Sequence, residues 1–138
     1  MSDNNRRSLA PGDHLSLTSE PIGRMQLALY SEASGDHNPM HLDALVAKKA
    51  GFDDVIVHGM LSMAIMGRML TDVVGPASIR RYRVKFSGVV PVDAQLICRA
   101  EVKAPETYGM SGALLECSAE LTDGTKVLIG SAELCVGT

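Results

Sequence analysis

The stretch that decides the fold is GMLSMAIMGRMLTDVV, residues 59–74. Its side chains are apolar on almost every side of a helix, and Gly75-Pro76 directly after it is a strong helix terminator. A helix that is apolar around most of its circumference is expected to be buried. The sequence therefore predicts one buried helix from Gly59 to Val74, for which the rest of the chain must supply a cover.

Every segment after this helix alternates apolar and polar residues, which is the pattern of a strand with one dry face. The alternation predicts four strands, near residues 81–86, 92–102, 113–121 and 125–136. Asp123-Gly124 is predicted to form a tight hairpin turn between the last two. An antiparallel sheet with a dry face needs a cover, and the helix at 59–74 is the only apolar element long enough to provide it. The predicted fold class is therefore α+β, an antiparallel sheet wrapped around a long central helix.

Three shorter elements are predicted before the central helix, a strand at 14–18 and helices at 25–34 and 43–50. A glycine, Gly35 or Gly51, follows each of these helices and ends it. Between them, Asn38-Pro39 resists helical continuation, because proline disfavours the α conformation in the residue before it. Residues 36–41 are therefore predicted to form a loop between two helices.

Length and composition fit one globular domain, since the chain has 138 residues, of which 46% are hydrophobic and 21% charged. Residues 1–8 are polar and are expected to be unordered, with residues 9–138 forming the single domain. A net charge of -3 gives no broad attraction to nucleic acid or to a membrane surface. Because the polar start lacks the apolar run of a secretory signal, a cytoplasmic location is expected. The partner is expected to be a small molecule or a protein.

Two further sets of residues have a structural interpretation. The three cysteines are odd in number and lack CxxC spacing, so they are predicted to be buried free thiols (Cys98, Cys117 and Cys135). The cations of residues 80–85 fit the wet face of a strand, with contact to the phosphates of a carrier as the alternative (Arg80, Arg81, Arg83 and Lys85).

The loop that reads SGDHNPMH, residues 34–41, concentrates a carboxylate, two imidazoles and an amide. Asp36 and His41 lie five residues apart across a bend, close enough for both side chains to hold one water molecule. A carboxylate and an imidazole together make an acid/base pair. Taken singly, each residue is more often structural, Asp36 as a turn cap and His41 as a satisfied buried group.

A second feature, VHGM at residues 57–60, favours the chemical interpretation of the loop. Gly59 stands at the start of the buried helix, where free backbone amides and the positive end of the helix dipole point outward. An amide aimed at a thioester oxygen would stabilise the enolate that forms when an α proton leaves or water adds to the β carbon. A tight junction between loop and helix is the alternative role for this glycine.

These two motifs carry a resemblance to a known family. YSEASGDHNPMH (residues 30–41) and VHGMLS (residues 57–62) resemble the signature of the MaoC-like (R)-specific enoyl-CoA hydratases and 3-hydroxyacyl thioester dehydratases. The resemblance implies that Asp36 and His41 hold the catalytic water and that the amide of Gly59 binds the thioester carbonyl. It also implies a hotdog fold over essentially the full chain, and a homodimer or heterodimer. The implied substrates are trans-2-enoyl or (R)-3-hydroxyacyl groups carried on coenzyme A or acyl carrier protein.

The expected activity is that of a lyase of the hydro-lyase class, working without a metal or an organic cofactor. Three residues are expected to support the catalytic pair without reacting themselves (Ser34, Asn38 and His58). Four residues of the central helix are expected to line the acyl channel, although most residues on such a helix are simply core (Met60, Met63, Gly67 and Leu70). The histidines also invite a metal interpretation, but the loop lacks the spacing of known metal sites.

Two other functions compete with this one. A hotdog thioesterase would use a carboxylate on the central helix, and residues 59–70 contain none. A non-catalytic acyl-binding or supporting subunit of a heterodimeric dehydratase would not need the acid/base pair, and both Asp36 and His41 are present. The sequence therefore favours the hydratase.

Overall fold

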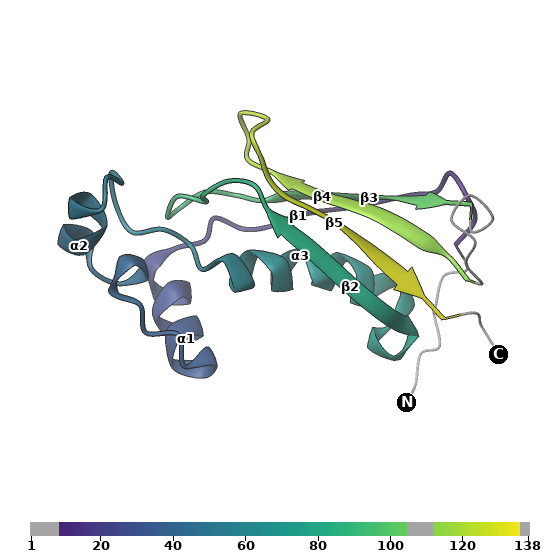
Figure 1. Cartoon of the computed structure of the whole chain (residues 1–138), viewed down its shortest axis with the longest axis horizontal. Helices are drawn as coiled ribbons and strands as arrows, with labels where there is room; N and C mark the ends of the chain where they lie inside the picture. The colour runs from purple at the N-terminus through teal and green to yellow at the C-terminus, as the bar shows by residue number, and fades with distance from the viewer. Residues whose placement is uncertain (1–8, 105–111, 136–138) are drawn as a thin grey trace.

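The computed structural model describes residues 9–104 and 112–135, and these form the predicted α+β arrangement (Figure 1). The helices are α1 (Arg24–Ser34), α2 (Ala44–Lys49) and α3 (Gly59–Val74), with short 3-10 turns η1 (Pro39–His41) and η2 (Pro76–Ser78). The strands are β1 (His14–Thr18), β2 (Ile79–Phe86), β3 (Ile97–Lys103), β4 (Leu114–Glu120) and β5 (Lys126–Leu134). Residues 1–8, predicted to be unordered, lie outside the described residues, as does Val136 at the end of the last predicted strand.

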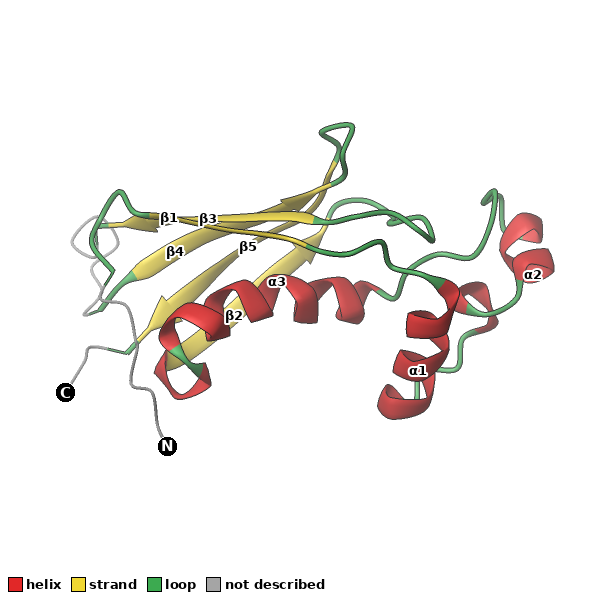
Figure 2. Ribbon diagram, turned by 180° about the vertical axis from the view of Figure 1, so that it is seen from behind, coloured by secondary structure: helices red, strands yellow, loops and turns green. Residues whose placement is uncertain are grey.

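The five strands form one antiparallel sheet in the order β1-β3-β4-β5-β2. Helix α3 lies along one face of this sheet and contacts both edge strands, β1 and β2, as well as β3 and β4 (Figure 2). A flat sheet would not bring both of its edges to one helix, so this sheet curves around α3. The prediction of a sheet wrapped around the helix at 59–74 is confirmed.

The core lies between α3 and the inner face of the sheet. Met66 and Leu70 of α3 are fully buried, and on β4 Leu115, Cys117 and Ala119 alternate toward them. Burial raises the pKa of the Cys117 thiol to about 12, which keeps it protonated. The prediction of three buried thiols was wrong for Cys135, which is exposed because β5 ends one residue before it.

Strand β2 meets α3 through two contacts of an aromatic ring with a glycine. The Phe86 ring lies 3.0 Å from the point that a Cβ on Gly59 would occupy, and the Tyr82 ring lies 3.2 Å from the corresponding point on Gly67. The Tyr82 hydroxyl also donates a hydrogen bond to the backbone carbonyl of Met63 at 2.8 Å. The two glycines therefore allow the edge strand to lie close against the helix.

One strand begins later than the sequence predicts. The alternation predicts a strand from residue 92, but β3 starts at Ile97. Before it the chain turns, with Asp93 at a positive φ of 68°, and the amide of Asp93 donates to the carbonyl of Ile22 at 2.8 Å. This hydrogen bond joins segments some 70 residues apart and keeps residues 92–96 out of the sheet. The alternating pattern of apolar and polar residues does not reveal such a contact.

The helical segments α1 and α2 lie beyond one end of the sheet, on the side where α3 begins (Figures 1 and 2). This places the loop between α1 and α2 next to the N-terminus of α3. Among the described residues, no helix combines the length and the apolar character needed to cross a membrane. The cytoplasmic location stays a prediction.

Gly130 tests the pairing of β2 with β5. A Cβ at this position would lie 2.2 Å from the backbone oxygen of Arg83, which belongs to the neighbouring strand. Gly130→Ala must therefore push the two strands apart, and we expect it to lower the free energy of unfolding by about 1–3 kcal/mol or more. Urea unfolding of this variant, with the neighbouring Ser131→Ala as the matched control, measures the effect. A Gly130→Ala variant as stable as the control would contradict this strand pairing.

Candidate active site

The loop that follows α1 is held in shape by its own side chains. Gly35 ends α1 in the left-handed conformation, with φ of 77°, which turns the chain sharply away from the helix. The Ser34 hydroxyl accepts a hydrogen bond from the amide of Asp36 at 3.1 Å, and Asp36 Oδ1 accepts one from the amide of Asn38 at 3.2 Å. Asn38 Oδ1 in turn accepts from the amide of Met40 at 3.1 Å. Ser34 therefore holds the backbone of Asp36, and the backbone amide of Asn38 holds the Asp36 carboxylate.

The His41 ring faces the Asp36 carboxylate. His41 Nδ1 lies 2.7 Å from the backbone oxygen of Ile56, which can only accept a hydrogen bond, so Nδ1 carries a proton. The neutral ring then presents an unprotonated Nε2, and this atom lies 4.0 Å from Asp36 Oδ2. The His41 side chain is 11% exposed and that of Asp36 is 49% exposed. A separation of 4.0 Å is too long for a direct hydrogen bond but suits one bridging water.

His58 lies next to Asp36 and His41 and is almost fully buried, at 1% exposure. Its ring stacks on His41 with centroids 3.8 Å apart and planes 25° from parallel. Its Nε2 lies 2.9 Å from the hydroxyl of Ser31 and 3.3 Å from the backbone oxygen of Asp36. Because that backbone oxygen can only accept, Nε2 donates to it, and burial lowers the pKa of His58, which favours the neutral ring. His58 therefore ties α1, the loop and the start of α3 together.

Gly59 begins α3 at the side of the pair, and no side chain caps this helix. A pocket of about 180 Å³ opens there, lined by His41, Gly59 and Ser62 together with apolar residues. The apolar lining comes from the segment before α3, the end of β2 with the chain after it, and the start of β5 (Ile56, Val57, Phe86, Val89, Val90, Val127 and Leu128). A larger hollow of about 840 Å³ is lined by residues of β1, β3, β4 and β5, and neither Asp36 nor His41 lines it. The smaller pocket is therefore the one beside the acid/base pair.

The arrangement is an acid/base pair with a helix N-terminus beside it. Comparisons with known proteins identify the family of the chain. The family model for the MaoC-like domain matches residues 7–115. This chain belongs to the MaoC-like dehydratase family. The resemblance seen in the sequence is confirmed.

Solved structures place this MaoC-like domain among the hotdog folds. An (R)-hydratase from A. caviae, involved in PHA biosynthesis, is 25% identical with a TM-score of 0.82, covering 95% of this chain and 99% of its own. The unliganded R-hydratase PhaJ1 from Pseudomonas aeruginosa is 29% identical with a TM-score of 0.78, covering 91% of this chain and 81% of its own. The predicted hotdog fold is confirmed.

Among the curated proteins, a peroxisomal hydratase-dehydrogenase-epimerase of Neurospora crassa is 38% identical over 102 residues. The match covers 66% of this chain and 11% of that protein. A mitochondrial 3-hydroxyacyl-[acyl-carrier-protein] dehydratase of Arabidopsis thaliana is 45% identical over 42 residues, which are 30% of this chain and 25% of that protein. The MaoC-like domain thus spans a quarter or less of the length of these relatives.

The residues expected to line the acyl channel do not share one environment. Met60 is 55% exposed on the first turn of α3, and Met63 and Gly67 are partly exposed further along the helix. Leu70 is fully buried in the core of the MaoC-like domain. The Tyr82 ring covers Gly67, so close packing of β2 also accounts for that glycine.

Three residues of the MaoC-like domain could supply ligands to a metal. Asp36, His41 and His58 each offer one ligand atom, and these atoms lie within 4.8 Å of one another. However, His41 Nδ1 and His58 Nε2 already bind oxygen atoms. His37, the remaining histidine of the loop, is exposed and lies 3.7 Å from the Glu32 carboxylate.

Sequence reasoning missed the partners that come from other elements. Ser31 anchors His58, the backbone oxygen of Ile56 sets the proton on His41, and Phe86 covers Gly59. Nothing in the one-dimensional pattern marks these residues, because each contact joins segments that are far apart in the sequence. For Ser31 a weak signal existed, since it lies inside the motif at residues 30–41.

The buried ring of His58 predicts a dependence of stability on pH. Desolvation lowers the pKa of His58, and His41 lowers it further whenever His41 is protonated. The unfolded chain therefore binds a proton here at a higher pH than the folded chain, so the free energy of unfolding falls as pH drops below about 6.5. We expect His58→Gln to lose this contribution, which has a slope of at most about 1.4 kcal/mol per pH unit.

Urea unfolding of the parent and the His58→Gln variant across this pH range gives the comparison. The difference in slope between the two proteins isolates the proton of His58 from those of the other titrating groups. Parallel curves for the two proteins would show that His58 titrates alike in the folded and unfolded chains.

Proposed function

We propose that this protein interconverts trans-2-enoyl and (R)-3-hydroxyacyl thioesters of coenzyme A or acyl carrier protein. The observation that carries the proposal is the pair of Asp36 and His41, whose facing atoms lie 4.0 Å apart beside the pocket at Gly59. Membership of the MaoC-like dehydratase family supports a lyase of the hydratase or dehydratase type. The A. caviae (R)-hydratase, similar over nearly the whole of both chains, supports the (R) stereochemistry.

In the hydration direction, the two side chains hold one water between them. Asp36 takes a proton from this water as the water oxygen bonds to the β carbon of the substrate. The π electrons of the carbon–carbon double bond shift toward the thioester oxygen, where the amide of Gly59 stabilises the resulting enolate. Asp36 passes the proton taken from the water to the unprotonated Nε2 of His41, and His41 then delivers it to the α carbon, which restores both groups to their starting states. Dehydration runs through the same steps in reverse.

The proposal needs no metal and no organic cofactor. The nitrogen of His41 that a metal would need is Nε2, which faces Asp36 and is assigned to the catalytic water in this proposal, while Nδ1 binds the Ile56 oxygen. The thioester carrier is a part of the substrate.

Activity measurements on the catalytic pair test the function. We expect the parent to hydrate an enoyl-coenzyme A, and Asp36→Asn and His41→Ala each to lower kcat by about 100-fold or more, because each removes a proton-transfer group. Loss of enoyl absorbance with crotonyl-, octenoyl- and longer enoyl-coenzyme A measures the rate. His37→Ala, in the same loop but directed toward Glu32, is the matched control and should retain activity.

Other outcomes would favour the competing functions. Release of free thiol from an acyl thioester, without loss of the enoyl group, would indicate a thioesterase. Among the residues of α3, however, the one carboxylate is Asp72, near the end of the helix far from Gly59, and it pairs with Arg68. Saturable binding of a thioester without turnover would indicate a non-catalytic acyl-binding subunit.

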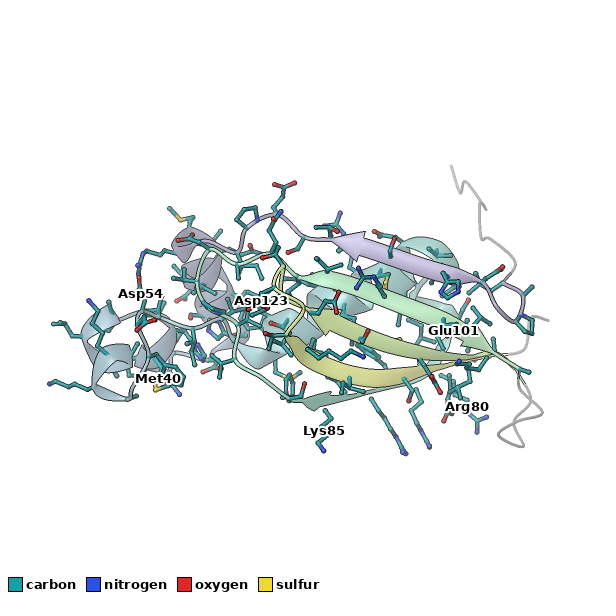
Figure 3. All side chains as sticks on the ribbon, turned by 90° about the horizontal axis from the view of Figure 1, so that it is seen from above. Met40, Asp54, Arg80, Lys85, Glu101 and Asp123 are labelled. Atoms are coloured by element: carbon teal, nitrogen blue, oxygen red, sulfur yellow. The ribbon has the colours of Figure 1, made fainter. Side chains whose placement is uncertain are left out.

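We also propose that two copies associate through the edges of their sheets. Strand β2 is an edge strand, and Phe86 near the pocket is 48% exposed on it. The charged residue before it, Lys85, points away from the sheet at this edge (Figure 3). Large apolar side chains are also exposed on α1, on α2 and just before it, and on the first turn of α3 (Met25, Leu29, Leu42, Leu45 and Met60). A second copy would pair the edge and cover this surface.

Sedimentation velocity over a range of protein concentrations tests the association. We expect a species of twice the chain mass of 14.7 kDa, because the exposed edge and apolar surface are costly in water. A monomer at every concentration would contradict the homodimer and favour a heterodimer with a different chain.

A further inference from the structure

One buried polar group beside the pair has no role in the steps above. Ser62 lies one turn into α3, at 1% exposure, and its hydroxyl makes no hydrogen bond within the described part of the chain. Buried hydroxyl groups normally have a partner, because leaving them unpaired costs free energy. An unpaired hydroxyl at this position therefore suggests a ligand that supplies the missing acceptor.

The usual partner of a helical serine is already occupied. Serine hydroxyls inside helices commonly donate to the backbone carbonyl one turn earlier. Here that carbonyl belongs to His58, and it accepts hydrogen bonds from the amides of Leu61 at 3.1 Å and of Ser62 at 3.2 Å. The Ser62 hydroxyl makes no third bond to it.

Ser62 lines the same small pocket as Gly59 and His41. Apart from His41, it contributes the one polar side chain among the residues that line this pocket. The N-terminus of α3 has no side-chain cap, so its first turn presents its amide donors at the same place. A ligand oxygen in the pocket would meet the positive end of the helix dipole and two kinds of donor, an amide and a hydroxyl.

We propose that the Ser62 hydroxyl is a second hydrogen-bond donor to the thioester carbonyl oxygen, beside the amide of Gly59. The proposal rests on the proposed function, in which this oxygen gains negative charge as the enolate forms. Two donors stabilise such a charge better than one, and in an apolar pocket each is worth more than in water. Ser62 is thereby a catalytic residue, since it touches the substrate.

The first experiment compares rates in Ser62→Ala, Ser62→Thr and the parent. We expect Ser62→Ala to lower kcat by about 10–1,000-fold while KM changes less, because the hydrogen bond strengthens as the enolate forms. Ser62→Thr keeps the hydroxyl and should recover a large part of the rate. The matched control is Ser78→Ala, which removes a serine of η2, just beyond the far end of α3, whose hydroxyl donates to the carbonyl of Val74 at 2.8 Å.

Protein stability separates this role from a structural one. Removing an unpaired buried hydroxyl removes its desolvation cost, so Ser62→Ala should unfold at the same or a higher urea concentration than the parent. A fall in both kcat and stability, with no recovery in Ser62→Thr, would mean that the hydroxyl serves the fold and would overturn the proposal.

A spectroscopic measurement tests the contact without turnover. Crotonyl-coenzyme A labelled with ¹³C at the carbonyl is bound to Asp36→Asn protein, with and without Ser62→Ala, and the infrared carbonyl stretch is recorded. Hydrogen bonds lower this frequency, so we expect the additional Ser62→Ala change to raise it. Equal frequencies in the two proteins would overturn the role of Ser62. Because this measurement needs binding alone, it can succeed even if the parent fails to hydrate any enoyl substrate, which would be the failure of the proposed function.

Discussion

The burial of α3 is the constraint on which the rest of the structure depends. Its side chains are apolar on nearly all sides. Each large apolar side chain that is fully buried stabilises the folded state by roughly 1.5–3 kcal/mol relative to the same side chain in water. A single flat sheet covers one side of a helix, so the sheet must curve until both of its edge strands touch α3. Gly59 and Gly67 permit this closure on one side, because the rings of Phe86 and Tyr82 lie against them.

The same arrangement leaves the first turn of α3 open. The sheet covers the length of the helix, but α1, α2 and their connecting loop lie beyond the end of the sheet where α3 begins (Figure 1). His58, the residue before α3, is held by Ser31 of α1 and by the backbone oxygen of Asp36. One buried ring therefore brings the Asp36 loop, the His41 imidazole and the helix N-terminus to one place, and the rest of the pocket lining is apolar.

Much of the candidate site was visible in the sequence because its residues are close together there. Asp36 and His41 belong to one loop, whose glycine and proline fix its shape, and Gly59 is marked by its place before an apolar helix. The core could be predicted for a similar reason. The period-two pattern of Leu115, Cys117 and Ala119 indicates which face of strand β4 is buried. The prediction was wrong for Cys135, and it placed the start of β3 too early, because the ends of strands depend on neighbours that alternation does not encode.

The sequence by itself determined the buried helix, the alternating strands, the loop with the candidate acid/base pair and the family, because each of these depends on residues that are close together along the chain. Only the tertiary structure decided which nitrogen of His41 carries a proton, since that depends on the backbone oxygen of Ile56. It also decided that Leu70 lies in the core and that the Ser62 hydroxyl has no partner among the described residues. Periodicity states that a residue faces inward, but the atoms it meets there come from segments that only folding brings together.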